Sequence, residues 1–212
     1  MSHELPAGRS KRVSVLLLLA AMLGAFGGLA ADAGSAVALE PHKDEKDKIK
    51  ACEKSLCGVI VGRKPVAGDL QCALSKAWAK KTLKDGTKKL RWGFGAARCE
   101  VDLKVPREMI IGALSAAEIK VTLPDHTVHC EIEREDKVDK ARITLAPVIE
   151  FKNGVAKKIW INVGEIKAPG VIKGFVWSAA QIQDTVGIYH RQMIKSVNRF
   201  IADQCPKVVA GG

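Results

Sequence analysis

The sequence predicts an α+β fold in which a curved antiparallel sheet of about 4–6 strands packs against one long C-terminal helix, with one or two short helices besides. Three observations lead to this prediction. A helical apolar pattern fills the C-terminal part, apolar and polar residues alternate through the middle, and the chain contains 6 cysteines. We expect residues 52–212 to form one domain, which is long enough to bury a substantial core.

The long helix is predicted over residues 168–205, where apolar residues recur at steps of three and four. Pro169 suits a first helical turn, and Pro206 is expected to mark the end. Charged residues fall mainly on the other side, so the helix needs an apolar partner. Its apolar face consists of Ile172, Phe175, Val176, Ala179, Val186, Met193, Val197, Phe200 and Ile201.

Alternation of apolar and polar residues predicts strands at 98–105 and 127–135. Residues 118–123 are a further strand candidate. Pro106 is expected to open a short helix that ends near Ser115. These segments supply the central part of the predicted sheet.

Closer to the N-terminus, the apolar run LCGVIVG at residues 56–62 reads as a short strand that ends in a turn. Helix-forming residues dominate residues 74–85, and Gly86 is expected to close a helix there. The predicted order is therefore strand, helix, antiparallel strands with one inserted helix, and the long helix.

Two alternating segments flank Asn153-Gly154 and predict a β-hairpin. A two-residue loop would pair Phe151 with Ala156 and place the two apolar sets on opposite faces. A three-residue loop pairs Phe151 with Val155 and brings both sets to one face. We therefore predict the longer loop, with Gly154 left-handed in a bulge, and we expect Pro147 to mark an edge or a bulge. The aligned face consists of Leu145, Pro147, Phe151, Ile159 and Ile161.

Residues 1–38 have the layout of a cleavable secretory signal peptide. Basic residues precede an apolar run at 13–30, and Ala36-Val37-Ala38 offers a cleavage site before Leu39. Cleavage after Ala33 and an uncleaved membrane anchor are the alternatives. We expect export to the bacterial periplasm or the extracellular space, with no transmembrane segment in the mature chain. The charged residues 39–51 are expected to form a flexible, solvated segment.

All the cysteines follow the predicted signal peptide, which favours three disulfides in an exported protein. No C-x-x-C spacing occurs, so neither a redox dithiol nor a zinc knuckle is indicated. Cys99 and Cys130 lie on the apolar faces of two predicted strands and are the easiest pair to join. Other connectivities stay open, and the expected remaining pairs are Cys72–Cys205 and Cys52–Cys57.

The formal net charge is +11 at pH 7, and basic residues concentrate around the predicted helix at 74–85. An exported basic chain meets anionic lipid head groups, envelope polysaccharide and acidic proteins before it meets nucleic acid. A solvated helix face would explain the same residues without a partner. The candidate basic patch consists of Lys76, Lys80, Lys81, Lys84, Lys88, Lys89 and Arg91.

No motif for catalysis or cofactor binding occurs in the sequence. Gly93-Phe94-Gly95 lacks a third glycine and precedes a strand, so a bend explains it better than a phosphate loop. His126 and His129 stand three apart in a predicted strand and face opposite sides, which argues against a shared metal. We expect solvation, not glycoside hydrolysis, for the acidic residues Glu131, Glu133, Glu135 and Asp136. The prediction is no catalytic, cofactor or metal site.

Three segments resemble a group of uncharacterised small exported proteins of proteobacteria. They are GDLQCALSKAW at residues 68–78, HTVHCEIER at 126–134 and IKSVNRFIADQCP at 194–206. The resemblance implies a location in the bacterial envelope and implies neither an activity nor a site. In outline, a long helix on a curved sheet is also similar to tubular lipid-binding modules, at the level of the fold alone.

We predict a non-enzymatic binding protein that holds an apolar or amphiphilic envelope ligand, such as a lipid, between the long helix and the sheet. An ordinary filled core is the simpler explanation of the apolar stripe. The alternatives are a basic protein that binds an acidic partner or an anionic surface, and, third, an enzyme of unknown class. The candidate ligand-facing residues are Phe175, Val176, Ala179, Val186, Met193 and Trp160.

Overall fold

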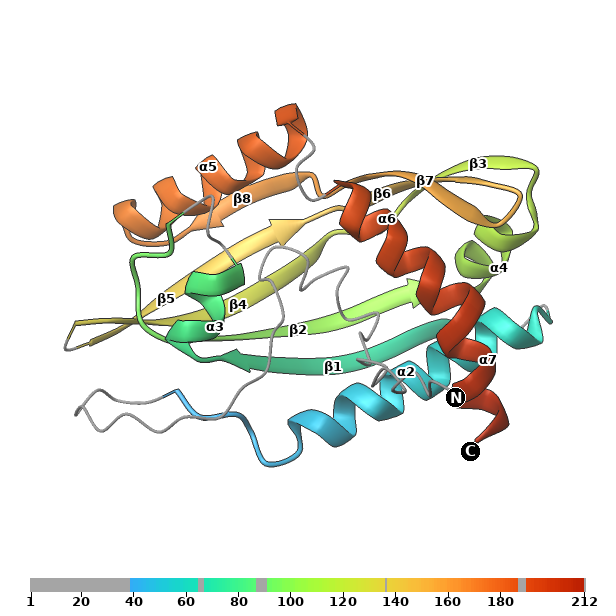
Figure 1. Cartoon of the computed structure of the whole chain (residues 1–212), viewed down its shortest axis with the longest axis horizontal. Coiled ribbons are helices and arrows are strands. Elements are labelled where there is room, and N and C mark those ends of the chain that lie inside the picture. The colour runs from blue at the N-terminus through green and yellow to red at the C-terminus, as the bar shows by residue number, and fades with distance from the viewer. Residues whose placement is uncertain (1–38, 65–66, 87–90, 136, 187–189, 212) are drawn as a thin grey trace, which may run out of the picture.

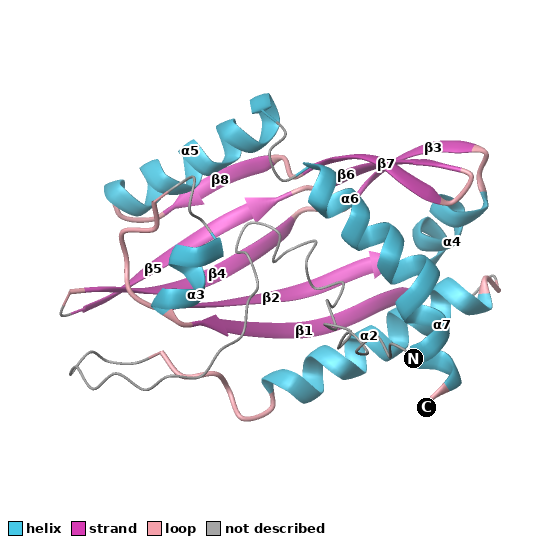
Figure 2. Ribbon diagram, in the orientation of Figure 1, coloured by secondary structure: helices cyan, strands magenta, loops and turns pink. Residues whose placement is uncertain are grey.

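The computed structural model describes residues 39–64, 67–86, 91–135, 137–186 and 190–211. It is an α+β structure with two antiparallel sheets (Figures 1 and 2). Sheet A has the order β1-β2-β4-β5-β8, and sheet B has the order β3-β6-β7. The predicted fold class is confirmed, and the predicted signal peptide lies outside the described residues.

Sheet A contains the long strands β1 (Asp69–Trp78), β2 (Ala97–Pro106), β4 (His126–Arg134) and β5 (Lys137–Leu145), and the short edge strand β8 (Val163–Lys167). The strands predicted from alternation at 98–105 and 127–135 are confirmed as β2 and β4. Helices α2 (Glu45–Gly62) and α5 (Gly170–Val186) lie against the edge strands β1 and β8, respectively (Figure 1).

Sheet B is small and consists of β3 (Glu118–Thr122), β6 (Val148–Lys152) and β7 (Val155–Trp160). Strand β3 and the preceding helix α4 (Arg107–Ser115) were both predicted from the sequence. Strands β5 and β6 were expected to be one strand, but the chain turns from sheet A into sheet B at Ala146-Pro147. The returning chain changes sheet at Ile161-Asn162, where Asn162 has a left-handed φ of 44°.

The predicted register of the β6–β7 hairpin is wrong. The loop has two residues, Asn153 and Gly154, with φ of 51° and 73°, and Phe151 pairs with Ala156. A register shift between Glu150 and Phe151 then pairs Ile149 with Ile159. The extra residue thus lies within the strands, and this bulge brings both apolar sets to one face without a longer loop.

Residues 56–62 are helical, not a strand, and they end helix α2. The expected flexible segment at 39–51 also contains the start of this helix at Glu45. Cys52, Cys57 and Ile60 are buried, and their spacing places them within one half of the helix circumference. A short apolar run does not distinguish a strand from the end of an amphipathic helix, which is why the prediction failed.

The helix predicted over residues 74–85 is also wrong for its first half. Residues up to Trp78 belong to β1, and only the short helix α3 (Lys80–Gly86) follows. Leu70, Leu74 and Trp78 are buried on one side of β1. A spacing of four suits a helix face and, because it is even, suits a strand face as well.

The helical pattern from residue 168 onward is divided among several elements. Helix α5 is followed by α6 (His190–Arg199), the π-helical turn η1 (Phe200–Gln204) and α7 (Cys205–Ala210). Figure 1 shows α5 along β8 and α6 on a different course across the sheet face. Pro206 lies in the first turn of α7, where its missing N–H costs nothing, and does not end the helical region as predicted.

Three disulfides join the described cysteines. The predicted Cys99–Cys130 bond links directly paired residues of β2 and β4. The predicted pairs Cys72–Cys205 and Cys52–Cys57 are wrong, because Cys52 bonds Cys72 and Cys57 bonds Cys205. Five residues apart on a helix, Cys52 and Cys57 point in different directions, so α2 is joined to β1 on one side and α7 on another.

Candidate apolar binding cavity

An apolar cavity of about 160 Å³ lies among α2, α4, both sheets and the end of the C-terminal helical region. Helix α6 and η1 supply three of its residues, so the C-terminal helical region contributes to the wall. The lining residues are Cys52, Glu53, Leu56, Ile60, Leu70, Leu74, Leu103, Val105, Met109, Ile110, Ala113, Leu114, Val121, Leu123, His126, Pro147, Ile149, Phe151, Val197, Phe200 and Ile201.

The periodicity of each element explains how so many apolar side chains reach one space. Residues four apart on α4, such as Ile110 and Leu114, share a helix face, and residues two apart on β2, such as Leu103 and Val105, share a strand face. Sheet B stands apart from sheet A because the chain turns at Pro147. The cavity is therefore formed where two sheets and three helical regions meet.

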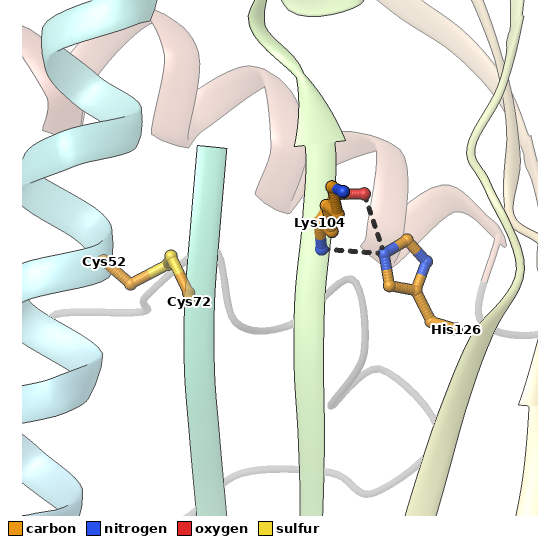
Figure 3. Close-up of a disulfide and its surroundings, with 4 residues drawn as sticks. All are labelled: Cys52, Cys72, Lys104 and His126. Carbon is orange, nitrogen blue, oxygen red and sulfur yellow. Dashed lines mark hydrogen bonds between the residues drawn. A yellow bond between two sulfur atoms is a disulfide. The ribbon is translucent and has the colours of Figure 1, made fainter. Parts of the chain in front are cut away.

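Glu53 and His126 are the two ionisable residues of the lining. His126 is buried, and its Nε2 lies 3.1 Å from the Lys104 backbone N and 3.2 Å from the Lys104 carbonyl oxygen. Depending on its tautomer, the ring accepts from the N–H or donates to the oxygen. Figure 3 shows the ring turned toward the Lys104 backbone on β2. These bonds give His126 a role in joining β4 to β2.

The chemistry that this lining can perform is the enclosure of apolar groups. Leucine, isoleucine, valine, methionine and phenylalanine make up most of the wall. The Cys52–Cys72 disulfide ties α2 to β1 at one side of the cavity (Figure 3). His129, the second histidine weighed as a metal ligand, is exposed while His126 is buried, and no group of three metal-ligating side chains occurs in the described part of the chain.

Among the candidate ligand-facing residues whose side chains the structure describes, none lines this cavity. Phe175 packs edge-on against Trp92 and Phe94, with ring centroids 5.2 and 5.7 Å away. Val176 belongs to the same core at the β8 side of sheet A, and Ala179 is half-buried on α5. Phe175 and Val176 thus fill a core, which was the simpler explanation of the apolar stripe.

The other three candidates lie elsewhere. Met193 is buried in a core between α6 and sheet B, and the side chain of Val186 lies outside the described part of the structure. The Trp160 and His190 rings lie edge-on with their centroids 6.3 Å apart, and the Lys120 ammonium lies 5.2 Å from the Trp160 ring centroid. Trp160 is thus held by cationic and aromatic neighbours at the margin of sheet B.

Sequence reasoning missed most of the lining because the cavity depends on where α2 and sheet B lie. Val197, Phe200 and Ile201 belonged to the predicted apolar stripe without being assigned to a site. Helix α4 carried a usable signal, since Met109, Ile110 and Ala113 form an apolar face in a predicted short helix. The remaining wall residues come mainly from α2, part of which was predicted to be a strand, and from strands whose arrangement into two sheets the sequence did not reveal.

The candidate basic patch is only partly one surface. Lys76 belongs to β1 and pairs with Glu45 at 2.6 Å, while Lys80, Lys81 and Lys84 are exposed on α3. Arg91 is exposed with a left-handed φ of 51°. The remaining members, Lys88 and Lys89, lie outside the described residues.

Two of the acidic residues that were predicted to be solvated bond to other parts of the protein. Glu131 pairs with Arg98 at 2.5 Å, and Glu133 accepts hydrogen bonds from the backbone of two other segments. Glu135 is exposed, and Asp136 lies outside the described residues. The prediction of plain solvation is therefore wrong for Glu131 and Glu133.

No family model, curated protein or solved structure in the comparisons matches this chain. The resemblance to small exported proteobacterial proteins therefore stays a prediction. Among the described residues, no helix combines the length and the apolar character that a membrane crossing requires.

Proposed function

We propose that this is an exported binding protein that encloses the apolar part of a small amphiphile in the cavity between α2, α4 and the two sheets. The observation that carries the proposal is the cavity of about 160 Å³, with its almost wholly apolar lining. Three disulfides support export, because such bonds persist mainly in oxidising compartments. The envelope of a bacterium is the location that the proposal assumes.

The size of the cavity limits the ligand. An engineered cavity of about 150 Å³ with a similar lining stays dry and binds benzene, whereas pockets for drug-sized ligands measure roughly 300–1,000 Å³. A single ring or the end of one acyl chain matches the smaller class. The polar head group of such a ligand would lie outside, because the wall offers few polar partners.

The direct test is to purify the protein from the periplasm and to examine an organic extract by mass spectrometry. A stoichiometric acyl or aromatic species supports the proposal, and an empty extract counts against it. Calorimetric titration with octanoic and decanoic acids then measures binding to the emptied protein. Saturable binding at one site is expected, and its absence together with an empty extract would refute the proposal.

A matched pair of substitutions locates the binding. Ala113 lines the cavity, whereas Ala97 is buried in a separate core at the opposite end of the same face of sheet A. Ala113→Leu should abolish binding and leave the protein as stable or more stable by about 0.5–2 kcal/mol, because it fills empty space. Ala97→Leu should cost about 1–3 kcal/mol through overpacking and leave binding unchanged. Equal effects of the two changes on binding would contradict the assignment.

A second candidate function rests on α3, where Lys80, Lys81 and Lys84 stand exposed beside one another. Such a cationic face could hold the protein on anionic lipid or an acidic partner. Binding to vesicles with anionic lipid should then weaken at high salt and in Lys80→Glu with Lys84→Glu. The control carries the same charge change at exposed sites away from α3, Lys157→Glu with Lys207→Glu. If both double variants bind like the original protein, this function is excluded.

A further inference from the structure

Glu133 holds the backbone of the first described residue. The Leu39 N–H donates to Glu133 Oε1 at 2.7 Å, and the Ala96 N–H donates to Oε2 at 2.8 Å. The Glu133 carbonyl oxygen also accepts from the Gly95 N–H at 2.8 Å. Among the residues that the structure describes, both carboxylate oxygens thus meet backbone N–H groups and neither meets a cationic side chain.

The neighbouring cations are already paired with other carboxylates. Arg98 contacts Glu131 at 2.5 Å on the strand beside Glu133. Arg134 contacts Asp139 at 3.1 Å, and Lys137 lies 3.6 Å from the same carboxylate. The negative charge of Glu133 is therefore left for a cation that the described side chains do not provide.

Gly95 permits the position of the Glu133 carboxylate. A Cβ at Gly95 would lie 2.5 Å from Glu133 Cβ and 2.6 Å from Oε2, which no side chain allows. The Trp92 indole N–H donates to the Gly95 carbonyl oxygen at 2.8 Å and secures this loop. The Gly93-Phe94-Gly95 segment was expected to form a bend. Its last glycine leaves the space that the Glu133 carboxylate occupies.

The residues after Leu39 follow a defined path across sheet A. The Arg98 guanidinium donates to the Glu40 carbonyl oxygen at 3.2 Å, and His42 Nε2 lies 2.8 Å from Glu100 Oε1. Glu45 then bonds the Lys76 ammonium at 2.6 Å. Contacts on β4, β2 and β1 in turn hold this segment, shown in blue in Figure 1.

We propose that Glu133 is the receptor for the mature N-terminus, which signal-peptide cleavage between Ala38 and Leu39 creates as an ammonium group. The nitrogen atom already lies 2.7 Å from a carboxylate oxygen, so hydrolysis of the peptide bond converts a neutral N–H donor into a cation in place. Water adds across the bond, the carboxyl group stays with Ala38, and the amine takes a proton. The neutral hydrogen bond becomes a charge-assisted one.

The geometry distinguishes between the cleavage sites that the sequence left open. Cleavage after Ala33 would leave five residues ahead of Leu39 and could carry the ammonium roughly 17 Å from Glu133. An uncleaved chain would place no ammonium at Leu39 at all. Only cleavage after Ala38 places the new charge on the atom that Glu133 contacts.

The first experiment identifies the N-terminus. The whole chain is expressed in a bacterium with an outer membrane, and the periplasmic product is analysed by intact mass and N-terminal sequencing. A product that begins at Leu39 is expected. A product that begins at Gly34, or one that retains residues 1–38, would overturn the proposal.

The second experiment measures whether the ammonium and Glu133 interact. Proteins that begin at Leu39 or at Ala38 are released from a fusion partner without extra residues, each with Glu133 or with Glu133→Gln. The protein that begins at Ala38 keeps the Leu39 N–H but carries its charge one residue away. We expect Glu133→Gln to lower the melting temperature about 2–4 °C more in the Leu39 form than in the Ala38 form.

Equal losses in the two forms would show that Glu133 acts only on the backbone N–H groups and would overturn the proposal. If Glu133→Gln fails to fold in either form, the comparison uses the unaltered side chains and acetylates the Leu39 amine. A lower melting temperature on acetylation supports the ion pair, and an unchanged one overturns it. Ligand binding in the cavity enters none of these measurements, so the two proposals can fail separately.

Discussion

At the scale of single residues, the start of α2 shows how burial changes the contribution of a carboxylate to the stability of the fold. Asp44 and Glu45 are neighbours, and each bonds a lysine: Asp44 bonds Lys48 at 2.8 Å, and Glu45 bonds Lys76 at 2.6 Å. Glu45 is only 2% exposed and also accepts from the Ala77 N–H at 2.9 Å. Asp44 is exposed, so water competes for its carboxylate.

The burial of Glu45 predicts a loss of stability when its side chain is removed. Glu45→Ala should lower the free energy of unfolding by about 1–3 kcal/mol, because the Ala77 N–H and the Lys76 ammonium lose their partner. Denaturant unfolding of the purified protein measures the loss. Asp44→Ala is the control and should lower the stability far less, because water competes for its exposed pair with Lys48. A similar loss in both variants would contradict this account.

The exposed pair at the same helix end predicts a pH effect. The hydrogen bond from Lys48 lowers the pKa of Asp44 below its ordinary value. A lowered pKa means that the charged pair stabilises the fold above the pKa of the unfolded chain, and that this contribution is lost as pH falls through the folded pKa. Lys48→Met should raise the pKa of Asp44 toward the ordinary value in an NMR titration. Lys46→Met, which alters a neighbouring exposed lysine, should not.

At the scale of elements, the β6–β7 hairpin shows how the chain resolves a conflict between turn and register. The Asn153-Gly154 turn favours a two-residue loop, while the apolar residues require a shifted register. A bulge in the strands satisfies both requirements. Pattern matching along the sequence assumed that any extra residue would lie in the loop, which is why the predicted register failed.

The turn predicts opposite effects for two glycine-to-alanine changes. Gly154 has φ of 73°, and a Cβ there would lie 3.0 Å from the Leu114 carbonyl oxygen, so Gly154→Ala should cost about 1–2 kcal/mol. Gly174 lies within α5 with open space around it, and Gly174→Ala should stabilise by about 0.5–1 kcal/mol. Thermal unfolding measures both, and stabilisation by Gly154→Ala would contradict the observed turn.

At the scale of the whole molecule, helix α2 connects parts of the chain that are far apart in sequence. Cys52 bonds Cys72 across 20 residues, whereas Cys57 bonds Cys205 across 148. One disulfide therefore joins α2 to its neighbour in sequence, and the other joins it to the C-terminal helix. The walls of the cavity on the α2 side depend on both.

The two disulfides of α2 should differ in how much they stabilise the folded protein. In the chain-entropy model, closing the loop between Cys57 and Cys205 stabilises by about 5 kcal/mol, and closing the loop between Cys52 and Cys72 by about 3 kcal/mol. Replacing Cys57 and Cys205 with serine should therefore cost more than replacing Cys52 and Cys72. Denaturant unfolding compares the two double variants, and the reverse order would show that strain or residual structure outweighs loop entropy.

Strands β2 and β4 of sheet A could be predicted because they alternate cleanly, whereas β8 was not predicted. The β2 and β4 segments show this alternation, and the pairing of Cys99 with Cys130 followed from it. Helix α2 and strand β1 could not be predicted, because their apolar spacings suit either kind of element. Those two errors also caused the wrong disulfide pairs, since the direction of Cys52 and Cys57 depends on the helix.

The candidate cavity was harder to predict than the fold. The sequence indicated an apolar face on the C-terminal helical region, and three residues of that face do line the cavity. It also led to Phe175 and Val176, which fill a different core. Periodicity tells which face of an element is apolar, but it does not tell whether the opposing surface fills the space.

The sequence by itself determined the α+β class, the alternating strands β2 and β4 and the Cys99–Cys130 bond, because each depends on spacing within one or two short segments. Only the tertiary structure decided the division into two sheets, the partners of Cys57 and Cys72, the cavity, and the contact between Leu39 and Glu133. Each of these depends on contacts between residues far apart in the chain. Local propensity carries no information about such contacts, since chain entropy and packing select them only when the whole molecule folds.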